Sequence, residues 1–171
     1  GGKKEFRPWD AKRRKMAPPE PRPLYNQPGM KDAAQVVLVE GEKCAQALID
    51  VGIVATTAMH GANAPVEKTD WSPLAGKSVL IWPDRDKPGW EYATQAAQAI
   101  LSAGAKSCFI LYPPEEAAEG WDAADAIAEG FDVAAFLAHG PRLQMHDITV
   151  DAEPVASSDE AVWGTEDALA L

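Results

Sequence analysis

The sequence predicts an α/β fold: a compact, Rossmann-like domain in which about four parallel strands are flanked by helices. Short apolar runs rich in β-branched residues alternate with segments of helical spacing, and acidic residues follow two of these runs directly. Such runs are typical of parallel strands buried on both faces, and the alternation favours right-handed crossovers. The predicted strands cover residues 36–40, 53–57, 78–82 and 107–112.

Helices are predicted between these strands. Residues 42–51 carry apolar side chains at helical spacing, and residues 89–103 form a longer pattern of the same kind. Pro88 suits the first turn of that longer helix. The remaining segments are a turn region at residues 61–65 and two short helices near residues 122–128 and 132–138.

The chain is expected to divide into a basic, proline-rich arm or linker (residues 1–33), one α/β domain (34–141) and an acidic tail or linker (142–171). Prolines are too dense at residues 18–23 for a regular helix or a central strand. The basic cluster at residues 12–15 either contacts phosphate or belongs to a solvated linker. Residues 24–26 are expected to pack the end of the arm onto the domain.

Composition limits the class of protein. A chain of 171 residues with 46% hydrophobic content can bury one core, which favours one domain. Cys44 and Cys108 are far apart and lack metal-binding spacing, so we expect two buried thiols rather than a zinc site or a disulfide framework. No apolar run approaches 18 residues, so we expect a cytoplasmic protein without a membrane span.

The net charge of −10 is unevenly distributed. Residues 1–35 carry nine Lys or Arg and four Asp or Glu, whereas residues 36–141 carry six and fifteen. Residues 142–171 add one basic and seven acidic side chains. An acidic domain and tail exclude a broad DNA-binding face, and carboxylates gathered around cations would explain part of the acidity.

Three carboxylates are the main candidates for chemistry. Glu40 ends the first predicted strand, and Asp84 and Asp86 follow the third. The carboxyl ends of parallel strands lie at the ligand-binding edge of an open sheet. Carboxylates grouped there repel one another, and one or two hard cations such as Mg²⁺ or Mn²⁺ would relieve the repulsion. A polar turn at Asp84 and Asp86, and a helix cap at Glu40, are the structural alternatives.

Neighbouring residues are weaker candidates. Gly41 permits close backbone approach at a site for a cation or nucleotide. Lys43 either meets a phosphate or is a solvated helix residue. Glu42 either belongs to the site or favours the helix dipole. His60 is expected to be a loop residue, because oxygen ligands suit Mg²⁺ better.

Glu40-Gly41 after one strand, with Asp84-x-Asp86 after another, resembles the topoisomerase–primase (TOPRIM) domain over about residues 34–140. Several segments resemble, more narrowly, the TOPRIM domain of phage and prophage primase–helicases. These segments are residues 22–26, 39–43, 68–74, 81–89 and 120–126.

The resemblance implies roles for individual residues. Glu40 would be the catalytic acid/base or a metal-bridging carboxylate, and Asp84 and Asp86 would be metal ligands. The later acidic motif of the family corresponds to Asp122, and less clearly to Asp125. Asp122 also stands where a helix N-cap belongs.

The function implied by the resemblance is Mg²⁺-dependent nucleotidyl transfer that makes RNA primers on single-stranded DNA in phage or mobile-element replication. The expected partners are single-stranded DNA, nucleoside triphosphates and further domains of the parent protein, such as a helicase. A TOPRIM-type nuclease and a non-catalytic metal-binding docking domain are the alternatives. The tyrosines lack a context that suggests a topoisomerase nucleophile, and the fragment is expected to need its missing domains for priming.

Overall fold

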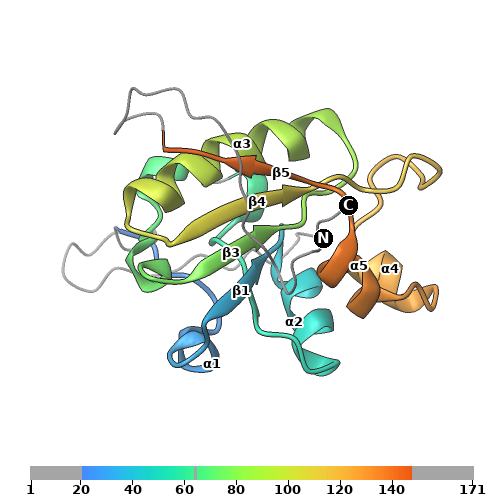
Figure 1. Ribbon diagram of the computed structural model, residues 1–171, viewed down its shortest axis with the longest axis horizontal. Coiled ribbons are helices and arrows are strands. Elements are labelled where there is room, and N and C mark those ends of the chain that lie inside the picture. Colours follow the sequence, from blue (N-terminus) through green and yellow to red (C-terminus); the bar gives the residue numbers. More distant parts are fainter. Residues whose placement is uncertain (1–20, 64, 148–171) are drawn as a thin grey trace, which may run out of the picture.

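The computed structural model describes residues 21–63 and 65–147, which build a five-stranded sheet of order β2-β1-β3-β4-β5. The first four strands pair in parallel, and β5 pairs antiparallel with β4. The arrows of β1, β3 and β4 therefore point one way in Figure 1, and β5 points the other. The strands are β1 (Gln35–Leu38), β2 (Ala55–Thr56), β3 (Ser78–Ile81), β4 (Ser107–Leu111) and β5 (Arg142–Met145).

After their first residue, the central strands β1, β3 and β4 are apolar and buried, because both faces of the sheet are covered. Successive residues of β1 alternate between two hydrophobic clusters, with Val36 and Leu38 in one and Val37 in the other. The same alternation in β3 places Ile81 on the first side and Leu80 on the second. The predicted α/β class and its four parallel strands are confirmed.

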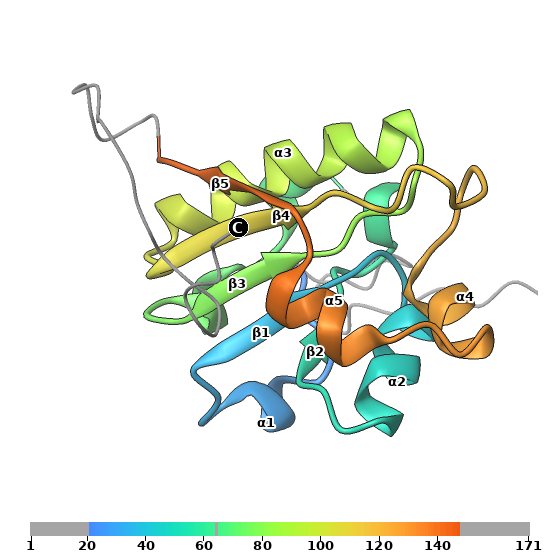
Figure 2. The same ribbon diagram turned by 45° about the vertical axis from the view of Figure 1, so that its right-hand side comes forward.

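The helices lie on both faces of the sheet (Figures 1 and 2). The long helix α3 (Lys87–Ser102) supplies the first cluster with its small residues Ala93, Ala96 and Ala97. The second cluster is closed by α2 (Glu42–Asp50), α4 (Ala123–Ala128) and α5 (Val133–His139). The short helix α1 (Gln27–Met30) and the 3-10 turns η1 (Gly61–Asn63), η2 (Val66–Lys68) and η3 (Ser72–Leu74) complete the described elements.

Strand β5 corrects the expected domain end, because residues 142–145 belong to the sheet rather than to the acidic tail. Met145 pairs with Cys108 and Arg142 with Leu111. Arg142 also donates to the carbonyls of Leu137 and Gly140, at 2.9 Å each, which ties the start of β5 to the end of α5. An edge strand is only partly buried, so it lacks the apolar run that reveals a central strand.

The expected arm also ends earlier than residue 33. Arg22 exchanges backbone hydrogen bonds with the segment around Thr69, and Leu24 is buried. The Tyr25 N–H donates to the Thr57 carbonyl at 3.0 Å, so the predicted packing of residues 24–26 onto the domain is confirmed. Residues 1–20 and 148–171 of the expected arm and tail lie outside the described residues.

Both cysteines are free and buried, as expected. Among the described helices, none has the length and apolar character that crossing a membrane requires.

Candidate active site

Glu40 and Asp84 meet at the carboxyl edge of the sheet, as their sequence positions predict. They follow β1 and β3, which are neighbours with Leu38 opposite Ile81. The Asp84 backbone N–H donates to Glu40 Oε2 at 2.9 Å. Glu40 is thereby fixed across the strand pair, and its second carboxylate oxygen is left for other partners.

Asp86 stands at the N-terminus of α3. Its backbone is extended, and its side chain accepts from the Gly89 N–H at 2.7 Å. The side chain is therefore a helix N-cap, whereas the structural alternative foreseen for this position was a polar turn. A capping carboxylate engages one oxygen here, so the second oxygen stays available for a cation.

Gly89 was predicted only as part of a helix, and the structure gives it a sharper role. A Cβ atom at this position would lie 2.5 Å from the Asp84 carbonyl oxygen and 2.8 Å from Glu40 Oε2. Real Cβ atoms do not approach backbone oxygens so closely. Glycine therefore allows the start of α3 to pack directly against Asp84 and Glu40. The only feature of the sequence that indicates this role is the position of Gly89 shortly after the Asp84-x-Asp86 motif.

Asp122 caps α4 with a capping box. Its Oδ1 accepts from the Asp125 N–H at 2.8 Å, and Asp125 Oδ2 accepts from the Asp122 N–H at 3.1 Å. The helix-cap alternative foreseen for Asp122 is thus confirmed. Its charge nevertheless acts on Glu40 and Asp84, so the four predicted carboxylates Glu40, Asp84, Asp86 and Asp122 share one electrostatic neighbourhood.

Arg85 brings the segment before α4 to the site, and sequence analysis missed it. Its guanidinium donates to the carbonyls of Pro114 and Glu115 at 3.1 and 2.9 Å. Its backbone exchanges hydrogen bonds with Trp121 and Gly120 at 2.9 and 2.8 Å. Because Arg85 stands between Asp84 and Asp86, these bonds hold Asp122 close to the pair. An arginine within an acidic motif was the only signal.

The environment of Asp84 disfavours its charge. Burial, followed by the negative charges of Glu40, Asp122, Asp86 and Asp125, raises the pKa of Asp84 from its ordinary value of 3.8 to about 8. Burial also raises the pKa of Glu40, against the lowering effect of the Asp84 N–H. Both carboxyls are therefore groups that gain from a nearby cation.

Two buried groups, Cys44 on α2 and Tyr92 on α3, are neutral. Burial raises the pKa of Cys44 to about 12, so Cys44 is a neutral packing residue. Burial and the charge of Glu40 raise the pKa of Tyr92. The Tyr92 hydroxyl has no hydrogen-bond partner among the described residues.

A cleft of about 550 Å³ opens beside these carboxylates. Gly41 lines it with a φ of 97°, a conformation that favours glycine, and its N–H donates to Thr57 Oγ1 at 2.8 Å. His60 lines the cleft as an exposed loop residue, and Glu42 lines it from the first turn of α2. Lys43 is exposed on α2 and is not among the lining residues.

The residues fit a cation that is shared with a ligand. Within the described ranges, no three His, Cys, Asp or Glu side chains form a group that could hold a metal ion alone. Mg²⁺ typically takes one or two protein carboxylates and completes its shell with water and substrate phosphates. The half-engaged oxygens of Glu40 and Asp86, together with Asp84, match that donor set better than an all-protein cage.

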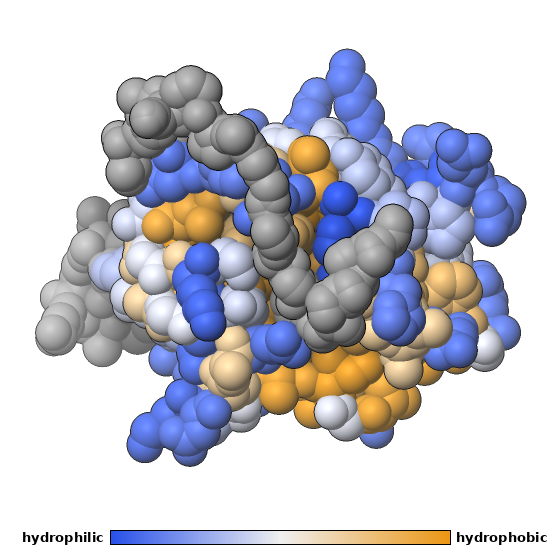
Figure 3. Space-filling model, viewed as in Figure 1, coloured by the Kyte–Doolittle hydropathy of each residue, from blue (hydrophilic) through white to orange (hydrophobic). Residues whose placement is uncertain are grey.

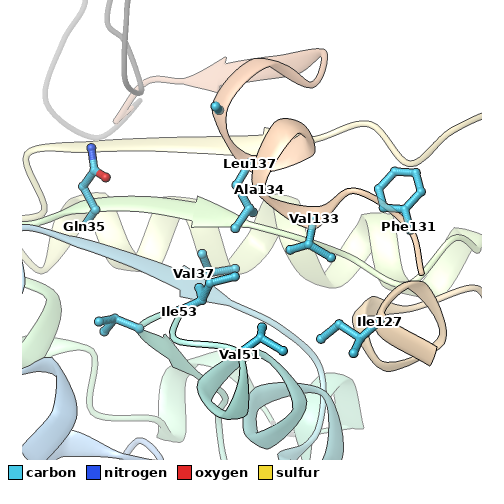
Figure 4. Close-up of a pocket in the computed structure, with 11 residues that line it drawn as sticks. Gln35, Val37, Val51, Ile53, Ile127, Phe131, Val133, Ala134 and Leu137 are labelled. Atoms are coloured by element: carbon cyan, nitrogen blue, oxygen red, sulfur yellow. The ribbon is translucent and has the colours of Figure 1, made fainter. Parts of the chain in front are cut away.

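A second hollow, of about 700 Å³, lies toward the amino ends of β1 and β2 (Figure 4). Its lining is apolar, with Val37, Ile53, Phe131 and Leu137 among its residues and Gln35 as its polar member. Figure 3 shows apolar surface over α2 and α5 on this side of the molecule. Since none of its lining residues is ionisable, the carboxylate cleft is the stronger candidate for an active site.

No family model and no curated protein matches the chain. Its fold is similar to the zinc-binding and RNA polymerase domains of the Aquifex aeolicus primase, with 22% identity and a TM-score of 0.45, over 65% of this chain and 27% of that one. A DNA primase domain from Pseudomonas aeruginosa is similar with 20% identity and a TM-score of 0.49, over 66% and 35%. The chain thus spans about a third or less of either structure. Structural similarity this low does not indicate what reaction the chain catalyses. The chemistry is argued from the residues of the site alone.

Replacing Gly89 with alanine should destabilise the protein. Alanine is the better helix former by about 1 kcal/mol, but its Cβ would collide with the Asp84 carbonyl and Glu40 Oε2. We expect a net loss of about 1–3 kcal/mol in the free energy of unfolding, measured by urea denaturation. Gln95→Ala, on the exposed side of the same helix, is the control and should change stability by less than about 0.5 kcal/mol. Equal stability of Gly89→Ala and wild type would refute the close packing.

Asp84 should make stability depend on pH in the absence of divalent cations. Its pKa in the folded protein, about 8, lies above its ordinary value of 3.8, so between these values the folded state retains a proton that the unfolded state loses. The free energy of unfolding then falls as pH rises through this window. As pH rises from about 4 to about 9, the free energy of unfolding of Asp84→Asn should therefore increase by about 1–2 kcal/mol relative to that of the wild type. This figure is reduced to account for solvent screening of a half-buried group.

The control for this measurement is Glu116→Gln, which removes an exposed carboxylate from the loop before α4. Urea denaturation in the presence of a chelator, repeated across the pH range, gives the comparison. If the curves of wild type and Asp84→Asn run parallel, the elevated pKa of Asp84 is wrong.

Proposed function

We propose that this chain is the TOPRIM catalytic module of a DNA primase, which joins ribonucleotides into primers on single-stranded DNA with Mg²⁺ or Mn²⁺. The observation that carries the proposal is the hydrogen bond from the Asp84 N–H to Glu40 Oε2. It joins the two halves of the motif on which the family resemblance rests, and it does so at the ligand-binding edge of a parallel sheet.

Asp84 and Asp86 are the residues that would hold the cation, with Glu40 beside them. A bound divalent ion would offset the negative charge of the carboxylates and of a triphosphate, and would favour ionisation of an attacking 3′-hydroxyl. Asp122 adds charge to this neighbourhood from its capping position on α4. It acts on the site at a distance, through electrostatics, whether or not it binds the ion.

Glu40 is the best-placed proton acceptor. The Asp84 N–H holds Oε2, which orients the carboxylate and leaves Oε1 to receive a proton from the attacking hydroxyl. Burial raises the pKa of Glu40, which makes it a stronger base than an exposed glutamate. Because Gly89 has no Cβ, the start of α3 can lie directly against Glu40 Oε2.

The parent protein, in this proposal, carries further domains such as a helicase and serves phage or mobile-element replication in the cytoplasm. The acidic surface of the domain requires other parts of that protein to hold the template, because carboxylates repel the phosphate backbone. Activity is therefore to be measured on the full-length parent.

Glu40→Gln in the full-length parent should lower primer synthesis by about a hundredfold or more, because the proton acceptor is lost. Glutamine keeps an oxygen for the Asp84 N–H, so the fold should be retained. The measurement is incorporation of labelled ribonucleotides on a single-stranded template. Glu67→Gln removes an exposed carboxylate from η2, outside the cleft, and should prime like wild type.

Undiminished priming by Glu40→Gln would count decisively against this assignment. Cleavage of nucleic acid without nucleoside triphosphates, abolished by the same substitution, would instead identify a TOPRIM-type nuclease. Absence of both activities in the wild-type parent would favour a docking domain.

A further inference from the structure

A pair of aromatic rings stands beside the carboxylates at the same edge of the sheet. Trp90 lies in the first turn of α3, four residues after Asp86. Its backbone N–H donates to the Asp86 backbone carbonyl at 3.1 Å. Tyr112 directly follows β4. The rings are stacked, with centroids 5.2 Å apart and planes inclined by 14°.

This pair differs from the other ring contacts of the described residues. Those contacts are tilted or edge-on, at 41° to 80°, and involve Trp82, Trp121, Phe131 and Phe136 in the second hydrophobic cluster. Tyr112, by contrast, is 42% exposed. The stacked pair therefore reaches the surface beside the carboxylates, where a planar ligand would add to the stack.

The ring of Trp90 also lines a hollow. A cavity of about 470 Å³ is lined by two residues with apolar side chains, Trp90 and Pro113, and by five charged residues, Asp84, Arg85, Asp86, Lys87 and Glu119. Asp84 and Asp86 also line the carboxylate cleft, so the two hollows meet at this pair. The volume lies within the range of about 300–1,000 Å³ that is usual for small-ligand pockets.

The wall of this cavity is held in place. Arg85 donates from Nε and one terminal nitrogen to the carbonyls of Pro114 and Glu115, so it braces the loop while it lines the cavity. Lys87 is the basic side chain at the opening, with 85% of its side chain exposed and a 4.0 Å contact to Glu91. The cavity therefore brings an aromatic side chain and an exposed lysine together with the carboxylates of Asp84, Asp86 and Glu119.

We infer that Trp90, supported by Tyr112, forms a stacking site for a nucleobase whose phosphates reach Asp84 and Asp86 through a cation. This inference rests on the proposed function and assigns the base-binding side of that site. A neutral planar base tolerates the acidic surroundings and gains from the ring, whereas its phosphates need the cation and Lys87. The base belongs either to a free nucleoside triphosphate or to a single strand, since both present the same flat surface.

The test measures binding by the full chain with base-containing and base-free probes. ATP is compared with inorganic tripolyphosphate in Mg²⁺, and a short oligothymidylate is compared with an abasic oligomer of equal length. The wild type should bind at least one base-containing probe about fivefold or more tightly than its base-free counterpart, the ratio expected for one stacked base. The ATP pair and the oligomer pair distinguish the two sources of the base.

Trp90→Leu and Tyr112→Leu keep apolar bulk but remove a ring, and both should abolish or strongly reduce the preference for the base. Trp90→Phe and Tyr112→Phe keep a ring and should retain it. Val51→Ala, at an exposed apolar residue in the other hollow, is the control and should bind like wild type. Unfolding by urea identifies any variant that loses its fold, and Tyr112→Leu, at an exposed position, then carries the test.

The inference is overturned if the wild type binds base-containing and base-free probes equally or binds none of them, or if folded ring-removal variants keep the full preference for the base. Such a result leaves the proposed function standing as long as the full-length parent primes and Glu40→Gln does not. If the full-length parent and its Glu40→Gln variant primed equally, the proposed function would be removed. A preference for the base that depends on the two rings would still establish the stacking site.

Discussion

The contact between Glu40 Oε2 and the Asp84 N–H organises the candidate site, because it joins the ends of two neighbouring parallel strands. It places a carboxylate against the start of α3, where Asp86 caps the helix and Gly89 has no side chain to obstruct the approach. Strand order, helix cap and glycine all converge on this point. A sheet in which β1 and β3 were not neighbours would separate the motif into two unrelated turns.

This arrangement works against stability. Burial and four neighbouring carboxylates raise the pKa of Asp84 to about 8, so the folded chain holds acidic groups where their charges repel. A purely structural turn has no need of such a cluster, since asparagine or serine also caps helices well. A cation shared with phosphate relieves the repulsion, which connects the carboxylate cleft with the ring-lined cavity through Asp84 and Asp86.

Most of the fold could be predicted from sequence, because buried parallel strands such as Val36–Leu38 leave unbroken apolar runs. Strand β5 escaped prediction because an edge strand is half solvated, and the pairing of Arg22 with Thr69 because it joins segments distant in sequence. The carboxylates were predictable from strand ends and motif spacing. Gly89 and Arg85 were not, since a close approach and a brace across a loop exist only in three dimensions.

The proposed chemistry requires the Asp84 and Asp86 carboxylates to bind a divalent cation, and calorimetric titration with Mn²⁺ or Mg²⁺ measures that binding. Asp84→Asn/Asp86→Asn removes both charges while asparagine keeps the helix cap. Asp132→Asn, which replaces the capping aspartate of α5 in the same way, is the matched control. We predict that the double variant binds the cation at least about tenfold more weakly, since loss of a residue that merely supports a metal ligand already has an effect of that size. Asp132→Asn should bind the cation as tightly as the wild type. Equal affinity of the double variant and wild type would contradict the account.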